Sequence, residues 1–171
     1  IWAQAYWVPW GIAHYYDQGL AFGILFSLAV SVVYYGIDTA GFAASYALLP
    51  RRWSAPARIL LTAALWVSFE FLRAHLFTGN PWLMLGYALV PWPRLAQAAD
   101  LGGVYLLSFI VALVGAALAE AWPRADGAAR HRGAGLALAA VSVLLLALYG
   151  TLQLSRPPAP GSAIDVAVVQ G

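Results

Sequence analysis

Long apolar segments separated by short polar turns constrain this chain more than any other feature of its sequence. A helix needs about 20 mostly apolar residues to cross a membrane. Segments 19–49, 57–77, 95–122 and 133–154 each reach that length. The sequence therefore predicts an all-α polytopic membrane helix bundle, which extends over residues 1–154.

The amino-acid composition supports this prediction. Hydrophobic residues make up 63% of the chain and charged residues 9%, against about 25% charged residues in a soluble domain. A water-soluble fold of 171 residues cannot bury so much apolar surface. The formal charge of +2 comes with no basic stripe, so no nucleic-acid partner is expected. The sequence has no cysteine, which excludes disulfides and thiolate chemistry within these residues.

The two ends of the chain lead us to expect a fragment of a longer protein. Residues 1–15 are too short to span a membrane but are rich in Trp and Tyr, as in the exit half of a helix at the water interface. Residues 155–163 are rich in proline and predict a stiff linker. Residues 164–169 (IDVAVV) are mostly β-branched and alternating, which predicts that residues 164–171 are the first strand of a domain outside the membrane.

The arginines predict the orientation of the bundle. They concentrate in the connections 50–58 and 123–132, whereas connection 14–18 holds none and connection 78–94 holds only Arg94. The positive-inside bias places the two Arg-rich connections in the cytoplasm. The other two connections and the C-terminal strand are then expected on the opposite face.

Glu70 and Arg73 are the costliest residues to place in the apolar segment 57–77. An Arg or Asp at the bilayer centre costs roughly 2.5–3.5 kcal/mol on insertion scales, so ionisable residues there are candidate functional groups. Their i,i+3 spacing puts both on one helix face. Two interpretations are open: a mutual ion pair, or a pair that faces a cavity and either holds a polar lipid headgroup or supports the following loop. Arg suits a phosphate because its planar fork binds two oxygens.

The segment Gly79-Asn80-Pro81-Trp82 cannot continue this helix. Pro81 disfavours helical geometry at Asn80 and has no N–H to donate. Non-helical backbone at membrane depth is tolerated only where protein buries it or where it lines a water-filled cavity. The segment is therefore either an interfacial turn with Trp82 as a belt residue, or a re-entrant or gating loop beside a lipid-facing cleft.

Other polar and small residues carry weaker signals. Asp38 lies in the apolar segment 19–49 and is expected to bond to a neighbouring tyrosine or to lie near the cytoplasmic interface. Asp100 is expected to be a favourable charge near a helix N-terminus. The three histidines do not share ligand spacing, so no metal site and no cofactor is expected. Close helix packing is predicted by two patterns of small residues, which are Gly19 with Gly23, and Ala112, Gly115, Ala116 and Ala119.

One ordered set of residues is similar to the hallmark segment of a known family. The set comprises Leu65-Trp66, Glu70 to Arg73, Thr78 to Trp82, Gly86-Tyr87, the stretch 97–109 (QAADLGGVYLLSF) and the stretch 166–171 (VAVVQG). In this order, and over essentially the whole chain, they resemble the bacterial apolipoprotein N-acyltransferases. The chain departs from the pattern at Asn80, where the family often has a bulky apolar residue.

The resemblance implies an eight-helix membrane domain and a nitrilase-like αββα domain, of which residues 164–171 would be the first strand of a truncated copy. It implies an enzyme that transfers an acyl chain from a phospholipid, through a thioester, to the N-terminal amine of diacylglyceryl-cysteine lipoproteins. The family uses a Glu-Lys-Cys triad for this chemistry. This chain has neither Lys nor Cys, so the triad does not lie within it and the chain is expected to be inactive alone.

The resemblance also implies a setting and partners. We expect a multi-pass protein of the bacterial inner membrane, with the C-terminal domain on the periplasmic side. The expected partners are a phospholipid acyl donor, a lipoprotein acceptor and the lipid bilayer, and the protein is expected to be a monomer.

The expected role of the membrane part is to position diacyl substrates, an orientation effect that supplies several kcal/mol. Trp82, with Leu83 and Met84, would line the lipid entrance, and Glu70 and Arg73 would fix the loop or contact a headgroup. The predicted substrate-binding residues are Glu70, Arg73, Gly79, Asn80, Pro81, Trp82, Met84 and Tyr87. Two alternatives remain: a transporter or channel segment, although no inverted repeat is visible, and a non-enzymatic membrane scaffold.

Overall fold

The described part of the chain is helical. The computed structural model describes residues 7–50, 52–76, 79–122 and 132–157, together with residue 167, and has no strand within these ranges. Three helices are long and apolar enough to cross a membrane, namely α4 (Ala55–His75), α6 (Ala99–Ala121) and α7 (Arg132–Leu154). The other elements are α1 (Val8–Tyr15), α2 (Leu20–Ser31), the π-turn η1 (Val32–Gly36), α3 (Ile37–Ala47), the 3-10 helix η2 (Leu85–Leu89) and α5 (Pro93–Ala96).

Within the described ranges the predicted all-α fold is therefore confirmed, with three helices that could span a membrane. The predicted linker 155–163 lies outside the described residues from residue 158 onwards. The predicted strand 164–171 also lies outside them, apart from residue 167, so the nitrilase-like domain stays a prediction.

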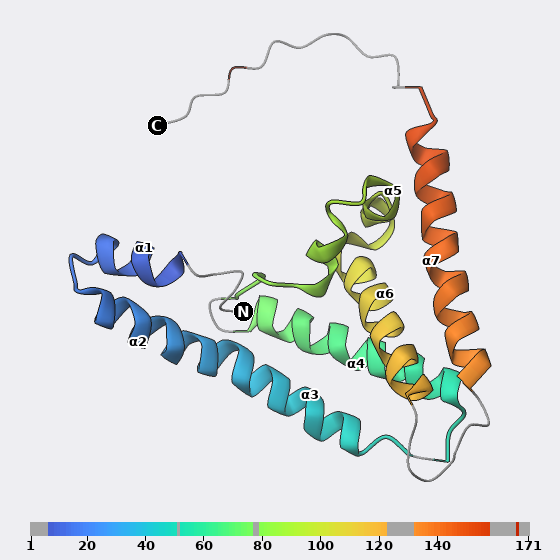
Figure 1. Cartoon of the computed structure of the whole chain (residues 1–171), viewed down its shortest axis with the longest axis horizontal. Helices are drawn as coiled ribbons and strands as arrows, with labels where there is room; N and C mark the ends of the chain where they lie inside the picture. The colour runs from blue at the N-terminus through green and yellow to red at the C-terminus, as the bar shows by residue number, and fades with distance from the viewer. Residues whose placement is uncertain (1–6, 51, 77–78, 123–131, 158–166, 168–171) are drawn as a thin grey trace.

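The segment predicted as one span over residues 19–49 is a helical run with a π-turn in its middle. α2 passes into η1, and η1 into α3, without leaving right-handed helical dihedral angles. Figure 1 shows the three as one long rod, with α1 folded back along α2. At 1.5 Å per residue the run is roughly 40 Å long, which exceeds the about 30 Å of a bilayer core. That it spans the membrane with a tilt stays a prediction.

The core lies where α4, α6 and α7 meet. Its fully buried residues are small or branched, so the three helices pack closely around Ile59 of α4 and Leu113 of α6. At one end of this core, Arg58 in the first turn of α4 pairs with Glu120 near the end of α6, with Nη2 and Oε1 2.7 Å apart. The helix ends that flank the two Arg-rich connections thus lie together, as the predicted orientation requires.

The helix predicted over residues 95–122 is broken near its start. α5 ends at Ala96, and α6 begins at Ala99. Within α6, Gly102 and Gly103 then leave helical geometry, and Gly103 has φ 61°. Glycine adopts such a backbone at little steric cost. The prediction of one continuous helix was therefore wrong for its first turns.

The small-residue patterns pack closely only in part. Gly23 allows α2 to touch the backbone carbonyl of Pro9 in α1, whereas a Cβ at Gly19 would meet nothing within 4 Å. A Cβ at Gly115 would also meet nothing within 4 Å, and this glycine is exposed. The prediction of a helix packed against the stripe on α6 therefore fails at Gly115, because that residue faces an open cavity.

Candidate functional site

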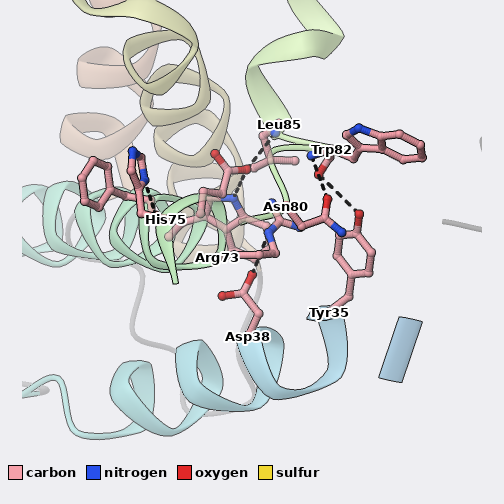
Figure 2. A network of polar contacts seen from close by, with 10 residues as sticks. Tyr35, Asp38, Arg73, His75, Asn80, Trp82 and Leu85 are labelled. Carbon is pink, nitrogen blue, oxygen red and sulfur yellow. Dashed lines mark hydrogen bonds and ion pairs between the residues drawn. The ribbon is translucent and has the colours of Figure 1, made fainter. Parts of the chain in front are cut away.

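Glu70 is the centre of a buried polar site at the C-terminal half of α4. Its side chain is only 1% exposed. Its Oε1 accepts hydrogen bonds from Nε1 of Trp66 at 2.9 Å and from the backbone N–H of Leu85 at 2.8 Å. Leu85 begins η2, so the carboxylate ties the segment after the helix break back onto α4 (Figure 2). Oε2 of the same carboxyl group is buried and has no hydrogen-bond partner among the described residues.

A second contact fixes the same segment to α6. The backbone N–H of Gly86 donates to the hydroxyl of Ser108 at 2.8 Å, and both residues are buried. A Cβ at Gly86 would lie 2.5 Å from the carbonyl oxygen of Val104. Only glycine therefore fits between η2 and α6. Glu70 and Ser108 together hold two successive amides of the chain after the break.

Arg73 is bound by a different set of residues. It is 8% exposed, and its Nε lies 3.6 Å from Oδ2 of Asp38 in α3. Its guanidinium carbon lies 4.8 Å above the centre of the Tyr35 ring in η1, an arrangement in which the ring face attracts the cation. Arg73 thus connects α4 to the helix that contains the π-turn.

Glu70 and Arg73 do not form the mutual ion pair that their spacing allowed. Among the described residues, the acidic partner of Arg73 is Asp38, and Glu70 accepts from Trp66 and Leu85. Asp38 was expected to bond to a tyrosine or to lie near the interface, yet its partner is the arginine. The physical reason is that two N–H donors hold the Glu70 carboxyl towards η2, while Asp38 brings the opposite charge close to Arg73 from α3.

The loop after α4 is an ordered turn that departs from helical geometry. Gly79 has φ 68°, in the left-handed region that favours glycine. The backbone N–H of Asn80 donates to the carbonyl of Arg73 at 2.9 Å, and the Asn80 side-chain oxygen accepts from the N–H of Trp82 at 3.1 Å. The predicted break at Gly79-Asn80-Pro81-Trp82 is confirmed. Residues 77 and 78 lie outside the described part.

Trp82 stands out from this anchored loop. Its side chain is 58% exposed, and its ring centre lies 6.3 Å from that of Trp7. Together with Asn80 and Leu83 it lines an almost wholly apolar cavity of about 390 Å³. The other walls come from α1, the turn after it, α2 and η1, through Trp7, Val8, Pro9, Gly11, Ile12, Tyr15, Tyr16, Phe26, Ser27, Val30, Ser31 and Tyr35.

The remaining predicted site residues lie elsewhere. Met84 is 4% exposed, so it packs inside the protein, and it is not part of the cavity wall. Tyr87 is 47% exposed but does not line the cavity beside Trp82 either. Gly79 and Pro81 shape the loop without contributing to the wall. In the part of the chain that the structure describes, no three His, Cys, Asp or Glu side chains come together as metal ligands do.

A second cavity, of about 510 Å³, lies between α3, α4 and α6. Trp66, which donates to Glu70, and Leu85, which is held by it, form one part of its wall. The rest comes from α3, α4 and α6, through Phe42, Tyr46, Thr62, Val111, Ala112, Gly115, Ala116, Ala119 and Glu120. Both residues that donate to Glu70 therefore belong to the wall of this second cavity.

The sequence did not indicate Tyr35 and Ser108 as members of the site. Ser108 is a polar residue in a strongly apolar helix, which is a weak signal that it bonds to something. Tyr35 offers no such signal. It is one of several aromatic residues in its segment, and only the π-turn directs it towards the loop.

Comparisons with known proteins identify the family. Residues 1–117 match the family model described as apolipoprotein N-acyltransferase N-terminal domain. A protein of Bordetella bronchiseptica named apolipoprotein N-acyltransferase is 42% identical over 142 residues, which are 75% of this chain and 25% of that protein. A protein of the same name from Vibrio parahaemolyticus is 32% identical over 148 residues, which are 86% of this chain and 28% of that protein.

A further relative with the same name, from Azotobacter vinelandii, is 44% identical over 126 residues, which are 71% of this chain and 23% of that protein. No solved structure matches the chain. The chain spans about a quarter of the length of the curated relatives that it matches. With a family model that covers residues 1–117, the chain belongs to the apolipoprotein N-acyltransferase family and carries the membrane part of its N-terminal domain.

Proposed function

We propose that the chain is the membrane part of an enzyme that transfers an acyl chain from a phospholipid to the N-terminal amine of diacylglyceryl-cysteine lipoproteins. The names of the relatives support the transfer of an acyl group to apolipoproteins. The chain has no Lys and no Cys, so a Glu-Lys-Cys triad would be supplied from outside these residues. The part described here then has a positioning task rather than a chemical one.

The observation that carries this proposal is the exposed Trp82 beside an apolar cavity, on a loop that buried polar groups hold in place. The Glu70 carboxyl accepts the backbone N–H of Leu85 after the loop, and the backbone carbonyl of Arg73 accepts the N–H of Asn80 within it. An exposed aromatic ring on a fixed loop offers a rigid surface for an acyl chain. Holding a reactant in one geometry removes a large part of the entropic barrier of a bimolecular step.

We assign the roles of the residues accordingly. Trp82 contacts the acyl chain, with Asn80 and Leu83 beside it on the cavity wall. Glu70 and Arg73 are positioning residues, because their polar groups are engaged by the protein itself. Gly79 and Pro81 give the loop its shape, and the buried side chain of Met84 anchors it in the interior. Tyr87 lies in η2, directly after the loop, and is exposed.

The proposed location is the bacterial inner membrane, with the loop at residues 79–84 and the following domain on the periplasmic side. The arginine distribution supports this orientation. The pairing of Arg58 with Glu120 also supports it, because it brings together the helix ends next to both Arg-rich connections. Lipoprotein and phospholipid would then meet on the side where the loop lies.

The test uses the full-length protein in vesicles and follows the two half-reactions separately. Trp82→Ala should raise the phospholipid concentration needed for half-maximal acyl-enzyme formation about tenfold. The loss is limited to packing, because lipid tails are already in an apolar medium. Trp122→Ala removes another exposed tryptophan, at the end of α6, and should leave the rates unchanged. Normal rates of both half-reactions in Trp82→Ala would refute the proposed role.

A further inference from the structure

The π-turn η1 places two side chains of one helix against the Trp82 loop. A π-turn holds one more residue than an α-turn, so it rotates the side chains that follow by about 100° relative to those before it. Tyr35 lies in the turn and Asp38 comes directly after it. Figure 2 shows both reaching from this helix towards Arg73 and the loop. Such turns are frequent at functional sites.

The contacts form a continuous chain from the π-turn to Trp82. The hydroxyl of Tyr35 donates to the backbone carbonyl of Trp82 at 3.4 Å. The Tyr35 ring lies under the Arg73 guanidinium at 4.8 Å, and Asp38 lies 3.6 Å from Nε of the same arginine. The carbonyl of Arg73 in turn accepts the N–H of Asn80. Two successive portions of the loop are thus connected to one turn of one helix.

We infer that Tyr35, Asp38 and Arg73 form a clasp that sets the position of the Trp82 loop for the phospholipid acyl donor. Tyr35 itself lines the apolar cavity together with Trp82, so the clasp also forms part of the cavity wall. The Tyr35 hydroxyl and the Asp38 carboxylate are positioning groups in this inference, since they act on the lipid through Arg73 and the loop, whereas the Tyr35 ring is part of the cavity wall. The inference rests on the proposed function, because it assigns the donor lipid to this cavity.

The geometry explains why the arginine is buried without an acidic partner on its own helix. Arg73 is 8% exposed, and Asp38 supplies the opposite charge from α3. A planar guanidinium can stack on a ring and face a carboxylate at the same time. Asp38 fixes the guanidinium of Arg73, and this guanidinium fixes the Tyr35 ring. The ring in turn directs the Tyr35 hydroxyl at the carbonyl of Trp82.

A double-mutant cycle in the full-length enzyme tests the clasp. Tyr35→Phe keeps the ring but removes the donor to Trp82, and should raise the KM for the phospholipid donor two- to tenfold with kcat retained, the range of one net hydrogen bond. Asp38→Asn should act in the same direction. In a Trp82→Ala background, Tyr35→Phe should not raise this KM further, because the Tyr35 hydroxyl affects the lipid through the position of the Trp82 indole.

The matched control is Tyr46→Phe, which removes a tyrosine hydroxyl from the same helical run. Tyr46 packs on Phe42 and does not line the Trp82 cavity, so its KM should equal that of the unmodified enzyme. Additive effects of Tyr35→Phe and Trp82→Ala on KM would overturn the clasp. So would a change confined to kcat, which would indicate a general structural defect.

Hydrogen exchange separates failure of the clasp from failure of the proposed function. Amide exchange in the peptide that covers residues 79–84 should become faster in Tyr35→Phe and Asp38→Asn but not in Tyr46→Phe. If exchange is unchanged in both variants, the clasp does not exist, whatever the activity. If exchange becomes faster while Trp82→Ala shows normal donor kinetics, the clasp exists but the loop does not bind the donor, and the positioning role is overturned together with the proposed function.

Discussion

Replacing Glu70 gives the sharpest test of how the loop is held. Glu70→Ala removes the acceptor of two hydrogen bonds, those from Nε1 of Trp66 and from the backbone N–H of Leu85. Each hydrogen bond to a charged group contributes about 1.5–3 kcal/mol in soluble proteins, and side-chain bonds in membrane proteins average about 0.6 kcal/mol. Since the site is 1% exposed and no water replaces the carboxylate freely, we expect about 3 kcal/mol for the pair.

Glu70→Gln is a milder substitution at the same position. The amide keeps an oxygen in the place of Oε1, so both donors retain a partner. The bonds lose the assistance of the charge, and charge-assisted bonds are roughly twice as strong as neutral ones. The expected cost is therefore about 1 kcal/mol, clearly below that of alanine.

The assay is amide hydrogen exchange of the full-length protein in nanodiscs, read at the peptide that contains Leu85. Exchange of a protected amide reports the free energy of local opening, and about 1.4 kcal/mol corresponds to a factor of ten. Glu70→Ala should therefore accelerate the exchange at Leu85 about 100-fold, and Glu70→Gln about fivefold. Glu120→Ala removes the partner of Arg58 at the other end of α4 and should leave Leu85 unchanged.

Two results would refute this reasoning. Equal exchange in Glu70→Ala and the unmodified protein would mean that the carboxylate does not hold η2. Equal acceleration in Glu70→Gln and Glu70→Ala would mean that packing of the side chain, rather than its hydrogen bonds, is responsible.

Two further predictions concern helix contacts around the site, at Gly86 and at Asp100. Gly86→Ala places a Cβ 2.5 Å from the carbonyl oxygen of Val104 and should destabilise the protein by about 1–3 kcal/mol, as overpacking does. Its melting temperature should fall clearly below that of Gly115→Ala, whose Cβ meets nothing within 4 Å, and equal values would contradict the close approach. Asp100→Asn weakens the acceptor of the Tyr149 hydroxyl, which lies 2.7 Å away in α7, and should cost about 0.5–1 kcal/mol. Unchanged protease resistance of the end of α7 in that variant would show that the bond does not hold the two helices together.

The sequence predicted the helices and the place of the site better than the contacts within it. Apolar length is sufficient to find α4, α6 and α7, because a bilayer requires it. Pro81 after Asn80 is sufficient to find the helix break. Burying a charge in an apolar helix has a large energetic cost, and Glu70 and Arg73 are indeed buried among protein partners, whereas their part in binding a substrate stays a prediction.

The partners of those charges could not be read from spacing. Glu70 holds a backbone amide, and an amide belongs to every residue except proline, so no side chain marks it in the sequence. Arg73 meets Asp38 across two helices, and their alignment depends on a π-turn that the apolar pattern does not reveal. The small-residue stripe on α6 failed as a packing signal at Gly115, because the same residues fit a close helix and an open cavity equally well.

The predicted orientation in the membrane stays a prediction, and the structure adds contacts between helix ends that the sequence did not indicate. Arg58 and Glu120 were not predicted as a pair, yet their contact unites the ends that the arginine count had assigned to one side. Asp100 lies in the first turn of α6, as expected, and it also accepts from the side chains of Tyr149 and Gln153 in α7. Charges near helix ends thus serve as contacts between helices.

Saturable contact between residue 82 and the donor lipid is the most direct test of the central claim. A photoreactive phenylalanine derivative replaces Trp82 in the full-length protein, phospholipid is titrated into detergent micelles, and the lipid adduct at that residue is quantified by mass spectrometry. We expect the adduct at residue 82 to saturate as the lipid concentration rises, whereas the same group at position 122 should give only an adduct that grows in proportion to lipid. An adduct at residue 82 that never saturates, or none at all, would contradict the claim that this loop binds the acyl donor.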